Sequence, residues 1–186
     1  MLTSLDGRSA ATVERAGAAG MEDVSPETIA SADLILSIVP PGEAVALAKA
    51  LVTRLRESRH KPVYIDCNAL SPKTKTEIAG TLAETGCDII DGAIVGAPPR
   101  PGEKGPRIYV SGDRSDRASA LRTLGLDLRQ IDGPIGAAAA LKISYDLPST
   151  SSAVWIADVI AWIGLLAAPS TTSIAATLML HIRIFD

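Results

Sequence analysis

The feature that most restricts the fold of this chain is a regular alternation of short apolar strands with helical segments. Residues 33–39 form a continuous apolar, β-branched run, which is typical of a parallel strand covered on both faces. Residues 42–58 follow with helical periodicity, and residues 63–66 form the next buried strand. The same order continues to residue 131. It predicts an α/β fold built on a doubly wound, mainly parallel sheet.

The alternation also predicts where each element begins and ends. Ser9 and Ser71 are predicted helix N-caps, and Pro72 suits a first helical turn. The expected strands are residues 1–5, 21–24, 33–39, 63–66, 87–91, 107–111 and 126–131, and the expected helices are residues 10–19, a brief helix from 25, 42–58, 72–84 and 115–124. Ligands of such sheets bind beyond the carboxyl ends of the strands, so we expect a site in the loops after Leu5, Val39, Asp66 and Asp91.

Composition restricts the partners. The 186 residues suit one domain, or one domain with an appended piece, and a net charge of −3 argues against nucleic acid as a partner. Cys67 and Cys87 have neither C-x-x-C spacing nor neighbouring histidines, so we expect core thiols in a reducing compartment and no metal site. The first residues lack the pattern of a signal peptide, which favours a cytoplasmic protein.

Two loops carry residues suited to a nucleotide. Arg8 and Ser9 follow the first expected strand, where an arginine with a serine can hold the 2′-phosphate of NADP; a solvated turn would have the same composition. Pro40 and Pro41 end a buried strand, and together they form either a rigid apolar ledge for a nucleotide ring or an ordinary strand terminator.

Two further segments contain residues suited to binding an anion or to transferring a proton. Gly92 and Gly96 would let backbone amides approach a small anion, although a plain Gly/Pro loop explains them equally well. Lys142 is the one lysine in the apolar, small-residue stretch 133–146. A desolvated lysine there suits proton transfer, whereas a lysine on an ordinary amphipathic helix would extend its ammonium to solvent.

The ordered motifs resemble a known family. The series is DGRS, LSIVPP, YIDCNALSPKT, IIDGAIVGAPPRPG, RIYVSGD and GPIGAAAALK, over about residues 1–146. It resembles the 3-hydroxyacid dehydrogenase group, which includes 3-hydroxyisobutyrate and 6-phosphogluconate dehydrogenases, and is most similar to a branch of NAD(P)-dependent, 6-phosphogluconate-dehydrogenase-like oxidoreductases. The resemblance implies a Rossmann-like fold and hydride transfer from a small hydroxy acid to NADP or NAD.

The resemblance also implies roles for individual residues. Arg8 and Ser9 match contacts at the adenosine end of the cofactor, and Val39, Pro40 and Pro41 match a loop that runs along the dinucleotide. Asn68 matches a position near the nicotinamide and the substrate. The substrate-binding segment corresponds to Gly96 and Ala97, where Val95 replaces the group's serine.

Lys142 matches the catalytic lysine of the group, which would take the hydroxyl proton while hydride leaves for the nicotinamide. Asp146 lies one helical turn further, where many relatives carry a substrate-placing asparagine. A carboxylate at Asp146 would instead pair with Lys142 and hold it protonated, which puts base catalysis in doubt.

Two parts of the family pattern are missing from the sequence: the first strand with its phosphate loop, and most of the all-α carboxyl-terminal domain. The first strand and its G-x-G-x-x-G phosphate loop should precede Leu2, and no glycine run replaces them. Residues 1–132 are therefore expected to form an incomplete NAD(P)-binding Rossmann domain with an exposed sheet edge at the missing strand, and residues 133–186 a helical remnant of the all-α carboxyl-terminal domain.

Within that remnant, residues 153–168 are nearly all apolar but short of the about 20 needed to span a bilayer. A helix buried on a partner, such as a second copy in a homodimer, and a non-native tail are the alternatives to a membrane anchor. Two functions follow for the whole chain. The first is an NADP-preferring oxidoreductase, impaired here, and the second is a non-catalytic Rossmann fragment or partner-binding module.

Overall fold

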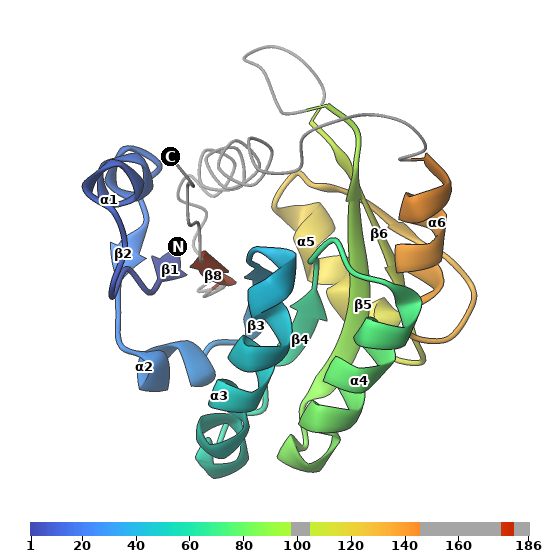
Figure 1. Cartoon of the computed structure of the whole chain (residues 1–186), viewed down its shortest axis with the longest axis horizontal. Coiled ribbons are helices and arrows are strands. Elements are labelled where there is room, and N and C mark those ends of the chain that lie inside the picture. Colours follow the sequence, from blue (N-terminus) through green and yellow to red (C-terminus); the bar gives the residue numbers. More distant parts are fainter. Residues whose placement is uncertain (98–104, 146–175, 181–186) are drawn as a thin grey trace.

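A central sheet organises the chain, as seen in a computed structural model that describes residues 1–97, 105–145 and 176–180. The described sheet has eight strands in the order β2-β1-β8-β3-β4-β5-β6-β7 (Figure 1). All neighbours pair in parallel except β5 and β6. The strands are β1 (Leu2–Thr3), β2 (Glu22–Asp23), β3 (Leu34–Ile38), β4 (Val63–Asp66), β5 (Asp88–Val95), β6 (Arg107–Ser111), β7 (Asp127–Gln130) and β8 (Ala176–Leu180).

Helices connect these strands and begin at serine caps. The side chains of Ser9, Ser25 and Ser71 each accept a hydrogen bond from the amide three residues later, at 3.2–3.3 Å. The described helices are α1 (Ala10–Ala18), α2 (Pro26–Ala30), α3 (Ala44–Glu57), α4 (Pro72–Leu82), α5 (Ala120–Thr123) and α6 (Ala137–Tyr145), and short 3-10 turns are η1 (Pro41–Glu43), η2 (Ala83–Thr85) and η3 (Ser115–Ser119).

The sheet is covered on both faces. Leu34 and Leu36 of β3 point to one face, where Leu121 of α5 belongs to the same apolar cluster. Ile35 points to the other face and packs with Tyr64 in a cluster that includes residues of α2, α3 and α4. Alternate residues of a strand point to opposite faces, so this division confirms the predicted doubly wound α/β sheet.

Two predictions about the elements need correction. β5 continues to Val95 rather than ending at Asp91, so Gly92 lies inside a buried strand and not in a ligand-binding loop. In addition, residues 176–180 form β8, which pairs with β1 on one side and β3 on the other. The expectation of an exposed sheet edge at this place is therefore wrong, because backbone hydrogen bonding of β8 fills it. The predicted apolar helix of residues 153–168 lies outside the described residues.

Gly92 has a packing role that makes a clear prediction. A Cβ at this position would lie 2.7 Å from Sγ of Cys67 and 3.0 Å from Cγ2 of Ile65. We expect Gly92→Ala to lower the free energy of unfolding by about 1–3 kcal/mol, because β4 and β5 would have to move apart. Gly80→Ala, with open space around the site on α4, is the control and should stabilise slightly. Urea unfolding measures both, and equal stabilities for the two variants would contradict this packing role.

The cysteines agree with their predicted place in the core. Cys67 is buried and Cys87 is half-buried, and both are free thiols. Burial raises the pKa of Cys67 to about 12, so its reactive thiolate is scarce at neutral pH.

Among the residues that the structure describes, no helix has the length and apolar character needed to cross a bilayer.

Candidate functional site

The predicted cofactor and substrate loops lie along one edge of the sheet. Strands β3, β4 and β5 are parallel neighbours, so the loops that follow them leave at the same edge (Figure 1). β1 runs in the same direction through its pairing with β8, which also pairs with β3. The edge therefore carries the segments that contain Arg8, Val39, Asn68 and Gly96.

Asn68 joins two of these loops through a buried side chain. Its Oδ1 accepts a hydrogen bond from the amide of Val39 at 2.6 Å, and its Nδ2 donates to Oγ of Ser37 at 3.0 Å and to Oδ1 of Asp66 at 2.7 Å. Only 3% of Asn68 is exposed. The side chain thus fixes the start of the Val39-Pro40-Pro41 loop. Its direct contact with a cofactor or substrate stays a prediction.

The adenosine-end residues have distinct surroundings. Ser9 caps α1, with its Oγ accepting from the amide of Thr12 at 3.3 Å. Arg8 is half-buried just before this helix. Partial burial lowers the pKa of the Arg8 guanidinium, and the nearby carboxylates of Glu43 and Asp6 oppose the shift. Glu43 closes η1, so the loop after β3 lies close to Arg8.

The remaining loop positions are partly described. Pro40 is half-buried and Pro41 is exposed at the start of η1. Gly96 has φ +129°, a conformation that favours glycine, and a Cβ there would lie 3.3 Å from Cα of Pro106. Ala97 is exposed beside it. The loop then continues into residues 98–104, outside the described part of the chain.

Lys142 lies on α6, with its ammonium at the carboxyl end of β5. Nζ donates a hydrogen bond to the carbonyl oxygen of Ile94 at 2.7 Å, and the side chain is half-buried. The side chain therefore lies against β5 rather than extending freely into solvent. Asp146, the predicted partner of Lys142, falls outside the described residues.

A row of buried polar side chains crosses the sheet below this edge. Ser37, Asp66, Asp91 and Ser111 occupy matching register positions on β3, β4, β5 and β6. Each is at most 2% exposed. Because residues paired in register point to the same face, the four side chains form one continuous row, which we call the polar row.

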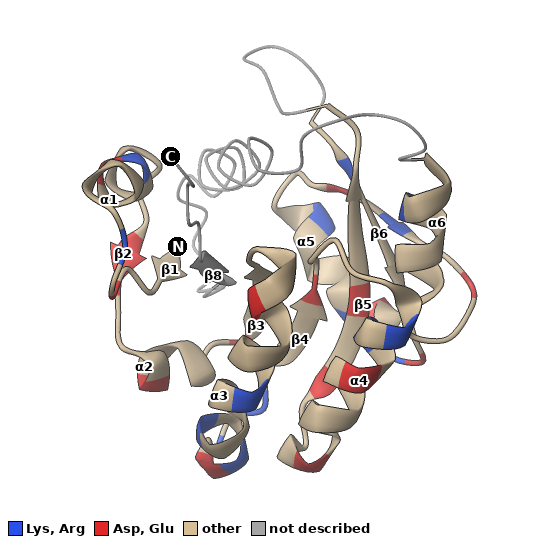
Figure 2. Cartoon of the chain, viewed as in Figure 1, with Lys and Arg blue, Asp and Glu red and all other residues tan. Residues whose placement is uncertain are grey.

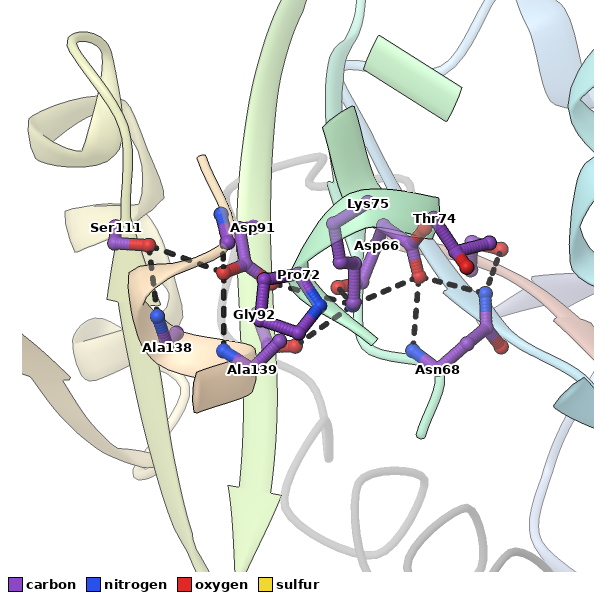
Figure 3. Close-up of polar contacts among 12 residues, drawn as sticks. Asp66, Asn68, Pro72, Thr74, Lys75, Asp91, Gly92, Ser111, Ala138 and Ala139 are labelled. Carbon is purple, nitrogen blue, oxygen red and sulfur yellow. Dashed lines mark hydrogen bonds and ion pairs between the residues drawn. The ribbon is translucent and has the colours of Figure 1, made fainter. Parts of the chain in front are cut away.

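Lys75 of α4 lies over the centre of the polar row (Figure 3). Its Nζ is 3.0 Å from Oδ1 of Asp66 and 3.3 Å from Oδ1 of Asp91, and it also donates to the carbonyl oxygens of Asp66 and, at 3.1 Å, Gly92. The residue is 1% exposed. A buried ammonium is tolerated only with such partners, so Lys75 and the two carboxylates form one electrostatic unit.

The outer end of the polar row holds the first turn of α6. Oδ2 of Asp91 accepts a hydrogen bond from the amide of Ala139 at 3.1 Å (Figure 3) and another from the amide of Gly136 at 2.9 Å. Oγ of Ser111 accepts from the amide of Ala138 at 3.0 Å and donates to Asp91. A carboxylate at a helix N-terminus satisfies amides that lack partners within the helix and complements the helix dipole. Asp91 therefore anchors the helix that carries Lys142.

Sequence reasoning missed Lys75 and the polar row, although two signals were present. Lys75 stands at the first position of the buried stripe of α4, followed by Ile78 and Leu82 at helical spacing. Asp66 and Asp91 interrupt apolar strands that are buried on both faces. A charge in either setting needs a buried partner, which the linear sequence does not identify.

Two cationic side chains lie at this end of the sheet. Arg8 is half-buried just before α1, and the ammonium of Lys142 lies at the end of β5. The 186 residues contain no G-x-G-x-x-G loop of the kind that binds a pyrophosphate. Figure 2 shows acidic and basic residues interspersed along the described helices and strands.

Comparison with known proteins gives a family match and structural relatives. The sequence model of the family described as the NAD binding domain of 6-phosphogluconate dehydrogenase matches residues 3–125. An uncharacterized 28.5 kDa protein of Methanothermus fervidus is 26% identical over 159 residues, which cover 84% of this chain and 59% of that protein.

Solved structures point to the same group. The conserved protein MTH1747, of unknown function and described as structurally similar to 3-hydroxyacid dehydrogenases, is 31% identical with a TM-score of 0.67, over 77% of this chain and 53% of that one. Mycobacterium tuberculosis 3-hydroxyisobutyrate dehydrogenase, solved with L-serine, shares the fold at 21% identity and a TM-score of 0.58, over 77% and 57% of the two chains. The present chain thus spans 53–59% of the length of these relatives.

Proposed function

Because this chain belongs to the family of the NAD binding domain of 6-phosphogluconate dehydrogenase, we propose that it forms the coenzyme-binding part of an oxidoreductase of the 3-hydroxyacid dehydrogenase type. The reaction is hydride transfer from a small hydroxy acid to NADP or NAD. One observation carries the proposal: Lys142 and the Val39-Pro40-Pro41 loop lie at the same carboxyl edge of the sheet, each held by hydrogen bonds from a neighbouring strand or loop.

In the proposed chemistry, Nζ of Lys142 acts as a neutral amine and becomes an ammonium when it accepts a proton. When bound, the nicotinamide ring supplies a hydride acceptor. Lys142 Nζ, held at the carbonyl oxygen of Ile94 and half-buried, accepts the hydroxyl proton of the substrate as the C–H bond breaks. Gly96 and Ala97, beyond the end of β5, are the proposed substrate contacts, together with Asn68 and Asp146.

The proposed coenzyme preference is for NADP. Arg8 supplies a charged donor group for a 2′-phosphate, and Ser9 follows it at the cap of α1. The proposed wall along the dinucleotide is the loop of Val39, Pro40 and Pro41. Oδ1 of Asn68 holds the start of this loop by accepting a hydrogen bond from the amide of Val39. Glu43 lies near Arg8 and competes with the phosphate for the guanidinium, so the preference is expected to be moderate.

Arg8→Ala tests this preference. Loss of a charge-assisted contact should weaken NADPH binding by at least about tenfold, while NADH binding changes by less than about threefold. Arg15→Ala, which removes an exposed arginine of α1, is the matched control and should change neither affinity. Titration of each coenzyme followed by nicotinamide fluorescence measures the effect. An equal loss for both coenzymes would contradict the 2′-phosphate contact.

We also keep a second candidate, a non-catalytic Rossmann fragment or partner-binding module. In the dinucleotide-binding order 3-2-1-4-5-6, the phosphate loop follows the central first strand. Here β8 holds the position between β1 and β3, and the 186 residues contain no Gly-rich loop. This arrangement favours weak coenzyme affinity in the chain as given. The two candidates separate on coenzyme binding, since the module would bind neither NADPH nor NADH.

A further inference from the structure

We propose that Lys75 is a positioning residue of the site: one buried ammonium joins the carboxyl end of β4 to the middle of β5 and thereby sets Asn68 on one side and the Lys142 helix on the other. The inference rests on the proposed function for its catalytic meaning. Lys75 itself is 1% exposed and under α4, so it acts through its neighbours.

Lys75 and Asn68 share one acceptor, the side chain of Asp66. Oδ1 of Asp66 accepts from Nζ of Lys75 at 3.0 Å, from Nδ2 of Asn68 at 2.7 Å and from the amide of Asn68 at 2.9 Å. Oδ1 of Asn68 in turn accepts a hydrogen bond from the amide of Val39 at 2.6 Å. The place of the proposed coenzyme loop therefore depends on where Asp66 is held.

Lys75 and the start of α6 share the carboxylate of Asp91. Oδ1 faces Nζ of Lys75 at 3.3 Å, and Oδ2 accepts from the amides of Gly136 and Ala139. Gly136 has φ +102°, and a Cβ there would lie 3.0–3.2 Å from atoms of Pro72, the first residue of α4. The start of α6 thus rests on the start of α4, and Lys142 follows on the same helix.

Two buried carboxylates face one ammonium, and the amides at the start of α6 supply the remaining stabilisation of Asp91. Without Lys75, Asp66 and Asp91 would repel each other across one step of the sheet. Both side chains would then move apart, and Asn68 and the start of α6, which are hydrogen-bonded to them, would move as well.

Hydrogen exchange of the full 186-residue chain tests the proposal without requiring activity. In Lys75→Met, we expect the amides of Val39, Gly136 and Ala139 to exchange about tenfold faster than global destabilisation alone explains, as judged from core amides of β3 and from urea unfolding. Lys73→Met, which removes an exposed lysine of the same helix, should leave these ratios unchanged. If Lys75→Met does not fold, Lys75→Gln, which keeps two donors, replaces it with the same expectation.

A common acceleration of all protected amides would show a merely structural role and overturn the proposal. Two single variants check direction. Asp91→Asn should loosen Gly136 and Ala139 but not Val39, and Asn68→Ala should loosen Val39 alone; the opposite pattern would also overturn it.

Kinetics then separate this proposal from the proposed function. In protein that binds NADPH, Lys75→Met should lower kcat by at least about tenfold, because the chemical step depends on the placement of Lys142, and should also raise KM for the hydroxy acid, because Asn68 is a proposed substrate contact. If the wild-type chain binds no coenzyme, the proposed function fails, whereas the exchange pattern still decides whether Lys75 positions the two elements.

Discussion

Replacing Lys142 by methionine is expected to lower kcat for oxidation of a hydroxy acid by about 10²- to 10⁴-fold, the usual contribution of a positioned general base. Methionine keeps the apolar stem against β5 but removes the group that donates to Ile94 at 2.7 Å. Lys142 contacts β5, whereas Arg8 and Ser9 follow β1, and β8, β3 and β4 lie between these two strands, so NADPH affinity should change by less than about threefold. The measurement is coenzyme absorbance in steady-state assays.

The assay of Lys142→Met needs a suitable background and a control. The 186 residues contain no Gly-rich phosphate loop, so the comparison is made in a form of the protein to which the family's first strand and loop are added. Ile143→Ala alters the neighbouring, exposed residue of α6 and should retain near wild-type turnover. Turnover that survives in Lys142→Met would remove the acid/base role.

Lys75→Met is expected to lower the free energy of unfolding by about 3–5 kcal/mol, since removal of one partner strands two buried carboxylates. Lys73→Met on the exposed side of α4 should change it by less than about 0.5 kcal/mol. Urea unfolding measures both. A loss below about 1 kcal/mol would mean that Asp66 and Asp91 carry no uncompensated charge in the folded chain.

A double-mutant cycle makes the Lys75 prediction specific. In an Asp91→Asn background, Lys75→Met leaves one buried carboxylate without its partner instead of two. The loss in free energy of unfolding caused by Lys75→Met should therefore be smaller by about 1–3 kcal/mol. Additive costs would indicate that Lys75 acts through packing of its stem, independently of the charge on Asp91.

Most of the fold could be predicted because its signals are local. The buried strands β4 and β6 follow from apolar runs, and Ser71 with Pro72 marks the start of α4. The end of β5 was harder to predict, since Gly92 is normally a turn residue and only its contact with Cys67 explains a glycine within the strand. β8 could not be predicted, because its position depends on pairing with β1 and β3, far away in the sequence.

Some residues of the candidate site could be suggested from the sequence, and others depend on the assembled sheet. Lys142, Arg8 and Asn68 could be identified from residue type and position in the ordered motifs, and Lys142 and Arg8 lie half-buried at the predicted edge. Lys75 could not be assigned a role, because its meaning depends on a register that aligns Asp66 with Asp91. Such an alignment is a property of the assembled sheet and leaves only the indirect signal of a lysine within an apolar stripe.

The most direct test of a coenzyme site at this edge is a titration of the isotope-labelled chain with NADPH, followed through its backbone amide resonances. NMR detects weak binding, which we expect of these 186 residues because they contain no G-x-G-x-x-G loop. We expect shifts at Arg8, Ser9, Val39 and Gly96, with smaller shifts at Arg8 and Ser9 when NADH replaces NADPH. A spectrum that NADPH leaves unchanged, or shifts confined to the opposite edge of the sheet, would contradict it.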